Sequence, residues 1–128
     1  GPSAARAWIS MKPATKIMSI TMRKTKDKHT RRYIDEQHYA HFSSFANPRQ
    51  LAEAFRASVS HDVSEVAGRL RIPTLLIAGE KDDITSLAKQ RHLHGAIDGA
   101  QLVVIDGVGH LTHYETPDQV ATAIHNFI

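Results

Sequence analysis

Cysteine is absent from the 128 residues of this chain. Without it the protein can form no disulfide, no thiolate nucleophile and no cysteine metal site. The sequence also lacks a run of about 18 or more apolar residues, which a transmembrane helix would need. It shows no apolar secretory segment near its first residues either. We therefore expect a cytoplasmic protein that does not enter a membrane.

The composition is that of a globular protein, with 41% hydrophobic and 23% charged residues. Residues 1–3, Gly-Pro-Ser, are typical of the remnant that a tag-cleaving protease leaves. Charge is uneven, since residues 1–34 hold nine lysines and arginines against one acid, whereas residues 35–128 hold seven against twelve. The basic run over residues 23–32 could contact phosphates, but a solvated loop or helix face is the more ordinary interpretation. We expect no nucleic-acid partner.

The first half of the chain is expected to be mainly helical. Residues 12–22 fit a helical stripe of apolar side chains, although strand alternation fits part of the same stretch. Residues 33–45 bring several aromatic side chains together without a regular period. Asn47 then supplies an N-cap and Pro48 a first helical residue, which predicts a helix from this point.

From residue 72 onwards the pattern changes to strands and helices in alternation. The apolar runs at residues 72–79 and 101–106 are typical of strands that are buried on both faces, as in parallel sheets. Helices are expected over residues 86–97 and 116–128. The order strand, helix, strand, helix predicts one right-handed crossover unit with a closing helix.

The loops that follow the two predicted strands carry residues suited to acid–base chemistry. They read GEKDDIT and GVGHLTH. In parallel α/β sheets, ligands bind beyond the carboxyl ends of the strands, where such loops lie. If the strands are neighbours, Asp82 and His110 emerge side by side. A carboxylate that accepts the Nδ1–H of the imidazole leaves the other ring nitrogen free as a general base. Gly107 and Gly109 suit a tight turn that returns the histidine over the strand end. Each piece alone also has an ordinary interpretation, as a simple turn or as aspartates that cap the next helix.

Taken together, residues 62–128 resemble the C-terminal end of an α/β-hydrolase. RIPTLLIAGEKDDIT is similar to the penultimate core strand and acid loop of that fold, and AQLVVIDGVGHLTHYETPDQVATAIHNFI to its last strand, histidine loop and final helix. The resemblance implies Asp82 as the triad acid and His110 as the triad base, in the chain order of that fold. Asp83 stands where a proline is common, which leaves open which aspartate is the acid.

The resemblance also implies that residues 1–61 form a cap or lid segment. The predicted fold class is therefore α/β, as a partial α/β-hydrolase fold. In this fold a helical cap segment, residues 1–61, precedes a β-α-β-α unit with parallel strands, residues 62–128.

The nucleophile of that fold has no counterpart in this sequence. It sits in a Gly-x-Ser-x-Gly elbow, and the chain contains neither this motif nor an HGGG-type oxyanion loop. Thr85, Ser86 and Thr112 lie near the predicted site, but none has the context of an elbow. The resemblance thus implies the C-terminal fragment of a hydrolase that uses a Ser-Asp-His triad on a small-molecule ester or similar acyl substrate. The fold also hosts cleavage of carbon–carbon and carbon–halogen bonds and other nucleophiles, so the reaction class stays open. By itself this fragment is expected to be inactive. The alternative is a non-enzymatic binding or assembly module that keeps idle triad residues.

Neither a cofactor nor a metal is expected. The histidines near the predicted site have a spacing that matches no zinc template; they are His92, His94, His110 and His113.

A homodimer is the expected assembly. In the family that the chain resembles, the strand around residues 75–78 is paired on both sides, and the upstream partner strand has no counterpart here. The free N–H and C=O groups of an apolar, unpaired strand edge can form hydrogen bonds with a strand of another chain. We therefore expect a two-fold dimer, formed either through this edge or by exchange of cap segments.

Overall fold

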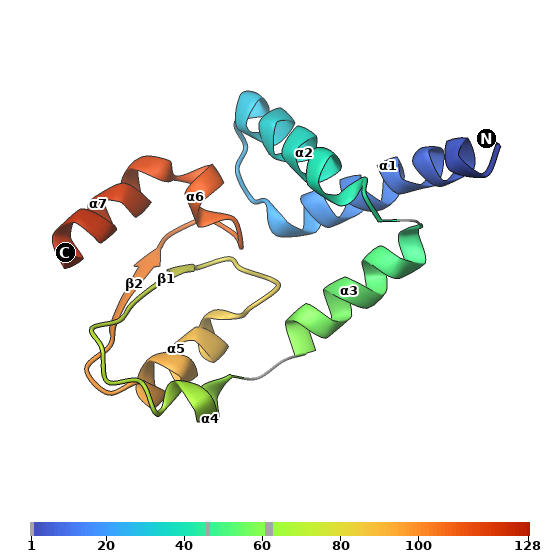
Figure 1. Ribbon diagram of the computed structural model, residues 1–128. Coiled ribbons are helices and arrows are strands. Elements are labelled where there is room, and N and C mark those ends of the chain that lie inside the picture. The colour runs from blue at the N-terminus through green and yellow to red at the C-terminus, as the bar shows by residue number, and fades with distance from the viewer. Residues whose placement is uncertain (1, 46, 61–62) are drawn as a thin grey trace. The chain divides into compact units, whose positions relative to one another are not determined.

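Helices and strands form two separate units along the chain (Figure 1). The computed structural model describes residues 2–45, 47–60 and 63–128. The units comprise residues 1–61 and 62–128. Residues 61 and 62, at the predicted domain boundary, and Gly1 of the predicted cleavage remnant lie outside the described residues. None of the described helices is long and apolar enough to cross a membrane. The described elements of the first unit are α1 (Pro2–Met22), α2 (Lys28–Phe42) and α3 (Pro48–Ser60).

Residues 33–45, which show no regular period in the sequence, form most of helix α2 and the turn after it. The expectation of a mainly helical first half thus holds here, although the sequence of this stretch shows no helical period. Asp27 caps the helix, because its side chain accepts the N–H of Thr30 at 2.8 Å. This bond and one from the Thr30 hydroxyl hold the pKa of Asp27 below its ordinary value. Ile34 and His38 are buried one turn apart, and the aromatic residues between and beside them hide this helical period in the sequence.

Helix α1 begins further towards the N-terminus than the apolar stripe over residues 12–22 predicts, and it continues through Pro13. The prediction of a helix over this stretch is confirmed, and its buried face agrees in part with the predicted stripe, since Met22 is 8% exposed. Thr15 and Ser19, one turn apart, are 2% and 0% exposed, whereas Ile17 is 67% exposed. A polar face of α1 is thus turned inward.

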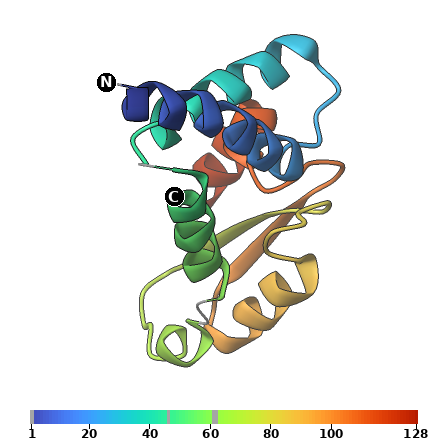
Figure 2. The same cartoon turned by 90° about the vertical axis from the view of Figure 1, so that its right-hand side faces the viewer.

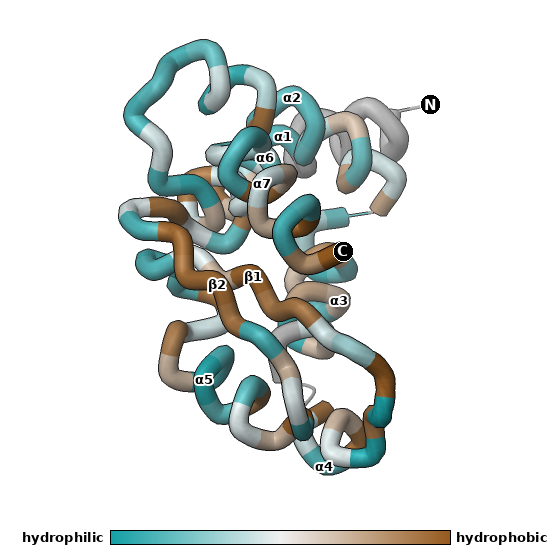
Figure 3. The backbone as a smooth tube through the Cα atoms, turned by 90° about the vertical axis from the view of Figure 1, so that its left-hand side faces the viewer, coloured by the Kyte–Doolittle hydropathy of each residue, from teal (hydrophilic) through white to brown (hydrophobic). Residues whose placement is uncertain are grey.

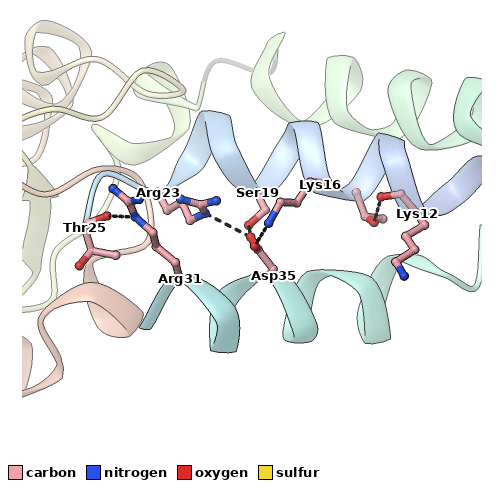
Figure 4. A network of polar contacts seen from close by, with 8 residues as sticks. Lys12, Lys16, Ser19, Arg23, Thr25, Arg31 and Asp35 are labelled. Atoms are coloured by element: carbon pink, nitrogen blue, oxygen red, sulfur yellow. Dashed lines mark hydrogen bonds and ion pairs between the residues drawn. The ribbon is translucent and has the colours of Figure 1, made fainter. Parts of the chain in front are cut away.

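A carboxylate on α2 explains this buried polar face (Figure 4). The two helices lie side by side and run antiparallel (Figure 2). Asp35 on α2 accepts hydrogen bonds from Lys16 and Ser19 on α1, and from Arg23 Nε at 3.1 Å. Burial by itself would raise the pKa of Asp35. The bonds from Lys16 and Ser19, with the charge of Arg23, outweigh burial and hold that pKa below its ordinary value.

Two parallel strands form the centre of the second unit. β1 pairs with β2 in a register that runs from Leu75 opposite Gln101 to Gly79 opposite Ile105. Helices α5 and α7 lie on opposite sides of this strand pair (Figures 1 and 3). The predicted β-α-β-α unit is therefore confirmed. Its described elements are α4 (Ser64–Ala67), β1 (Leu75–Gly79), α5 (Leu87–Ala96), β2 (Gln101–Ile105), α6 (Thr112–Glu115) and α7 (Pro117–Phe127).

The two strands are largely apolar (Figure 3), but only their carboxyl ends are buried. Ala78, Gly79 and Ile105 are buried, whereas the residues before them in both strands are half-buried or exposed. The prediction of strands buried on both faces is therefore wrong for most of their length. The physical reason is that the described sheet has only two strands, so no third strand covers either edge.

Candidate active site

The loop that follows β2 passes directly over the carboxyl end of β1. At Gly79, the last residue of β1, an added Cβ would lie 2.1 Å from Gly109 O and 2.7 Å from Val108 O. Only a residue without a side chain permits this approach. Gly107 has a φ of 75°, in the left-handed region that favours glycine. Gly107 therefore makes the turn, and Gly79 lets the loop cross the end of β1.

The two predicted catalytic side chains meet beyond these strand ends. His110 Nδ1 lies 2.9 Å from Asp82 Oδ2, inside the range of about 2.6 to 3.2 Å expected for an acid–base pair. The Asp82 side chain is 5% exposed and that of His110 is 34% exposed. A buried carboxylate thus holds one ring nitrogen, while a third of the imidazole stays open to solvent. The predicted proximity of the two side chains is confirmed, and their catalytic role remains a prediction.

Hydrogen bonds inside the acid loop fix the carboxylate that faces the histidine. Asp82 Oδ1 accepts the backbone N–H groups of Ile84 at 2.8 Å and Thr85 at 2.9 Å. Its neighbour Asp83 is exposed, so Asp82 is the aspartate that contacts the imidazole. The cap of α5 is Ser86, whose side chain accepts the N–H of Lys89. Asp82 is therefore not the cap of that helix, and its second oxygen is left for the imidazole.

The acid loop and the histidine loop are also joined through their backbones. The N–H of Glu80 donates to Ile105 O at 2.9 Å, and that of Lys81 donates to Val108 O at 2.8 Å. Two carboxylates accept N–H groups of the histidine loop: Glu80 Oε1 from Gly107 at 2.9 Å and Glu115 Oε2 from Gly109 at 3.4 Å. Sequence reasoning missed both glutamates. The parallel pairing offers one signal for Glu80, because it is the first residue past β1 and so emerges beside the turn that follows β2.

Ser86 and two of the histidines near the site have other partners. Ser86 caps α5, and no hydrogen bond joins a hydroxyl to His110 among the described residues. His94 Nε2 lies 2.8 Å from Ala100 O, and the ring of His113 stacks beside Tyr114. Within residues 2–45, 47–60 and 63–128, no group of three or more histidines and carboxylates could hold a metal ion.

A parallel strand pair, with its two loops joined beyond the carboxyl ends of the strands and a closing helix after them, defines the class of protein: the chain has a partial α/β-hydrolase fold. Its whole length aligns with Est816, described as an N-acyl homoserine lactone degrading enzyme, at a TM-score of 0.68 and 27% identity, and covers 52% of that chain. A thermophilic esterase from Thermogutta terrifontis aligns with 98% of this chain at a TM-score of 0.74 and 21% identity, with 47% of the esterase covered. At 21% identity the likeness to this esterase shows the fold alone.

Residues 3–117 match the serine aminopeptidase S33 family, and the chain belongs to this family. The protein "Putative carbamate hydrolase RutD" of Pseudomonas syringae pv. syringae (strain B728a) is 34% identical over 95 residues, which are 73% of this chain and 36% of that protein. Pyrrolizixenacetamide deacetylase of Xenorhabdus hominickii is 32% identical over 87 residues, 68% of this chain and 32% of that protein. The chain thus spans about a third of these relatives and about half of the solved structures.

Proposed function

We propose that this chain supplies the acid and the base of a serine hydrolase, with Asp82 as the acid and His110 as the general base. The observation that carries the proposal is the 2.9 Å contact between Asp82 Oδ2 and His110 Nδ1. Its position supports the proposal, because the ligand sites of parallel α/β sheets lie beyond the carboxyl ends of the strands.

In this proposal each nitrogen of the imidazole has a distinct task. With Asp82 ionised, Nδ1 carries a proton that it donates to Oδ2, and this bond fixes both the tautomer and the ring orientation. Nε2 then has a free lone pair that can take the proton from an attacking hydroxyl and later deliver it to the leaving group. The buried carboxylate stabilises the imidazolium that forms between these two steps.

The nucleophile and the oxyanion donors are proposed to lie outside this sequence. The 128 residues contain no Gly-x-Ser-x-Gly segment, which is where this fold carries its serine. The chain also spans only 36% and 32% of two relatives of its family. The chain is thus proposed to be the C-terminal fragment of a longer hydrolase, with residues 1–61 as part of its cap.

The relatives suggest the class of bond that is cleaved. Their names describe a carbamate hydrolase, an acetamide deacetylase, a methyl ester esterase and an enol-lactonase. All these substrates have an acyl carbon bonded to oxygen or nitrogen. We therefore propose a small-molecule ester, amide or lactone as the substrate of the complete protein.

The isolated chain should show no turnover of p-nitrophenyl acetate that depends on His110, because it has no nucleophile elbow. Initial rates of the wild-type chain and of His110→Ala are compared with buffer. His92→Ala is the matched control, since exposed imidazoles cleave activated esters slowly by themselves. Turnover that only His110→Ala abolishes, together with a serine adduct trapped by a fluorophosphonate, would contradict the proposal.

The reading frame upstream of the codon for Ser3 provides a direct test of the nucleophile. We expect it to encode a Gly-x-Ser-x-Gly segment. In the protein that this longer frame encodes, Asp82→Asn should lower kcat by about four orders of magnitude, because the asparagine imposes the wrong tautomer. Asp83→Asn is the control and should leave kcat close to the wild-type value. A complete frame without such a serine would overturn the proposal.

A non-enzymatic assembly module is the second candidate. It is favoured by the uncovered apolar surface around β1, where Ile72 is 66% exposed and Leu75, Leu76 and Ile77 are only half-buried. In that case Asp82 and His110 are idle, and the complete reading frame lacks the nucleophile segment. The same experiment therefore separates the two candidates.

A further inference from the structure

Glu80 contacts both the last residue of β2 and the loop that carries His110. Its backbone N–H donates to Ile105 O at 2.9 Å, and its carboxylate Oε1 accepts the N–H of Gly107 at 2.9 Å. The two contacts lie on either side of Asp106. Since Glu80 belongs to the loop of the proposed acid, this one residue ties that loop to the turn that precedes the proposed base.

Gly107, in the turn of the histidine loop, has no side chain that restricts its backbone. It is exposed and has a φ of 75°, and glycine has the widest range of backbone conformations. It also lies only three residues before His110. A carboxylate forms a stronger hydrogen bond to a backbone N–H than a neutral acceptor does. Opening of the turn at Gly107 would remove the first of the contacts that hold the loop before His110, ahead of those at Val108 O and at the Gly109 N–H.

We propose that Glu80 is a positioning residue for the proposed acid–base pair. By holding the N–H of Gly107, it keeps the imidazole of His110 against Asp82, with the ring proton on Nδ1 and the lone pair on Nε2. This inference rests on the proposed function, because the tautomer matters for catalysis only if His110 is the base. Glu80 acts through the loop backbone, since no hydrogen bond joins its carboxylate to the imidazole.

The experiment uses the ¹⁵N-labelled 128-residue chain and two variants of matched size. Glu80→Gln keeps an oxygen acceptor without the charge, whereas Glu80→Met keeps the side-chain length and offers only a weak sulfur acceptor. Asp106→Asn is the control, because it removes a neighbouring exposed carboxylate in the same turn. Two quantities are measured by NMR: the exchange rate of the Gly107 amide, and the ring ¹⁵N shifts of His110, which report the nitrogen that carries the proton.

We expect a protected Gly107 amide and a single Nδ1–H tautomer in the wild-type chain, in Glu80→Gln and in Asp106→Asn. In Glu80→Met the amide should exchange about fivefold faster or more, as expected for the loss of one hydrogen bond. The same variant should show both ring tautomers of His110. Wild-type behaviour of Glu80→Gln would show that the acceptor oxygen of residue 80, rather than its charge, protects the Gly107 amide and holds the His110 tautomer.

Two results would overturn the proposal. One is a Gly107 amide that exchanges at the rate of an unprotected glycine in the wild-type chain, which decides the matter even if a variant fails to fold. The other is fast exchange in Glu80→Met with an unchanged Nδ1–H tautomer, because Glu80 would then stabilise the turn without positioning the ring. Neither readout depends on turnover. A reading frame without a nucleophile serine would therefore end the proposed function and leave this result standing.

Discussion

Asp82 is buried, and its two oxygens accept hydrogen bonds from different partners. Oδ1 holds the N–H groups of Ile84 and Thr85, and Oδ2 faces the Nδ1 of His110. The first set of bonds shapes the acid loop, and the second orients the imidazole. These two contributions can be separated by substitution, because asparagine retains an oxygen for the loop and alanine does not.

Asp82→Ala should lower the free energy of unfolding of the second unit by about 1 to 3 kcal/mol, since two backbone N–H groups lose their acceptor. Asp82→Asn should cost less, because its amide oxygen can still accept the loop N–H groups. Its NH2 group then faces Nδ1 and can only donate, so the ring proton of His110 should move to Nε2. Urea unfolding, followed by NMR signals of residues 63–128, measures the first effect. Asp98, an exposed carboxylate of the same unit, provides the control, and Asp98→Ala should change stability by no more than about 0.5 kcal/mol. Equal losses for the two alanine variants would contradict this account.

Gly79→Ala should destabilise the second unit by about 3 kcal/mol or more, because overpacking against backbone atoms cannot relax by a change of rotamer. The added Cβ would lie 2.1 Å from Gly109 O. Gly95→Ala is the matched control in helix α5, where an added Cβ meets no atom within 4 Å. That variant should gain about 0.5 to 1 kcal/mol from the better helix propensity of alanine. Both values come from urea unfolding, and a neutral Gly79→Ala would refute the close approach of the two loops.

At the scale of the elements, the first unit depends on a polar contact between two helices. Ser19 is fully buried on α1 and donates to Asp35 on α2, and Lys16 and Arg23 donate to the same carboxylate (Figure 4). Such a contact requires the carboxylate to be ionised. The packing of α1 on α2 should therefore depend on pH.

The wild-type chain should lose helical stability in acid. The pKa of Asp35 is lower in the folded chain than its ordinary value of 3.8. The stabilisation that ionised Asp35 contributes is thus complete above pH 3.8, and it is lost as the pH falls through the lower pKa of the folded chain. The thermal midpoint, followed by circular dichroism from about pH 5 to pH 2, should fall less in Asp35→Asn than in the wild-type chain. Asp98→Asn, an exposed carboxylate of the other unit, should keep the wild-type dependence. An equal acid response in wild type and Asp35→Asn would argue against this contact.

At the scale of the whole molecule, β1 and β2 each have one edge without a strand partner among the described residues. The apolar surface near the β1 edge includes Ile72, which is 66% exposed. Pro73 precedes β1 by two residues and so takes no part in its ladder. The chain therefore has the features of a strand edge that pairs with another copy.

We propose that the chain forms a two-fold dimer at micromolar concentration, through this edge or through exchanged cap segments. Sedimentation velocity measures the assembly. Ile72→Lys should weaken association through the edge by about tenfold or more, because a charge beside the strand opposes pairing. Val66→Lys is the control, since Val66 is 64% exposed but lies on α4. A strictly monomeric, folded chain would show the proposal to be wrong, and a dimer insensitive to Ile72→Lys would favour exchanged segments.

The order of elements in the second unit could be predicted from the sequence because each signal is local. An apolar run, a capping serine and a proline at the first helical residue act within one or two turns of chain, and the structure has β1, α5, β2 and α7 where these signals lie. Parallel pairing then places the loops of Asp82 and His110 at one edge, which follows from connectivity alone.

Only the tertiary structure decided which polar side chains are buried and what they contact. Asp82 and Asp83 are adjacent and chemically identical, yet one is buried against His110 and the other is exposed. Glu80 finds its partner 27 residues away, and Ser19 finds Asp35 at a separation of 16. Hydrophobic period and local propensity carry no information about such partners. The contacts of a buried polar side chain depend on the donors and acceptors that folding places beside it. In these cases they come from segments that are distant in the sequence.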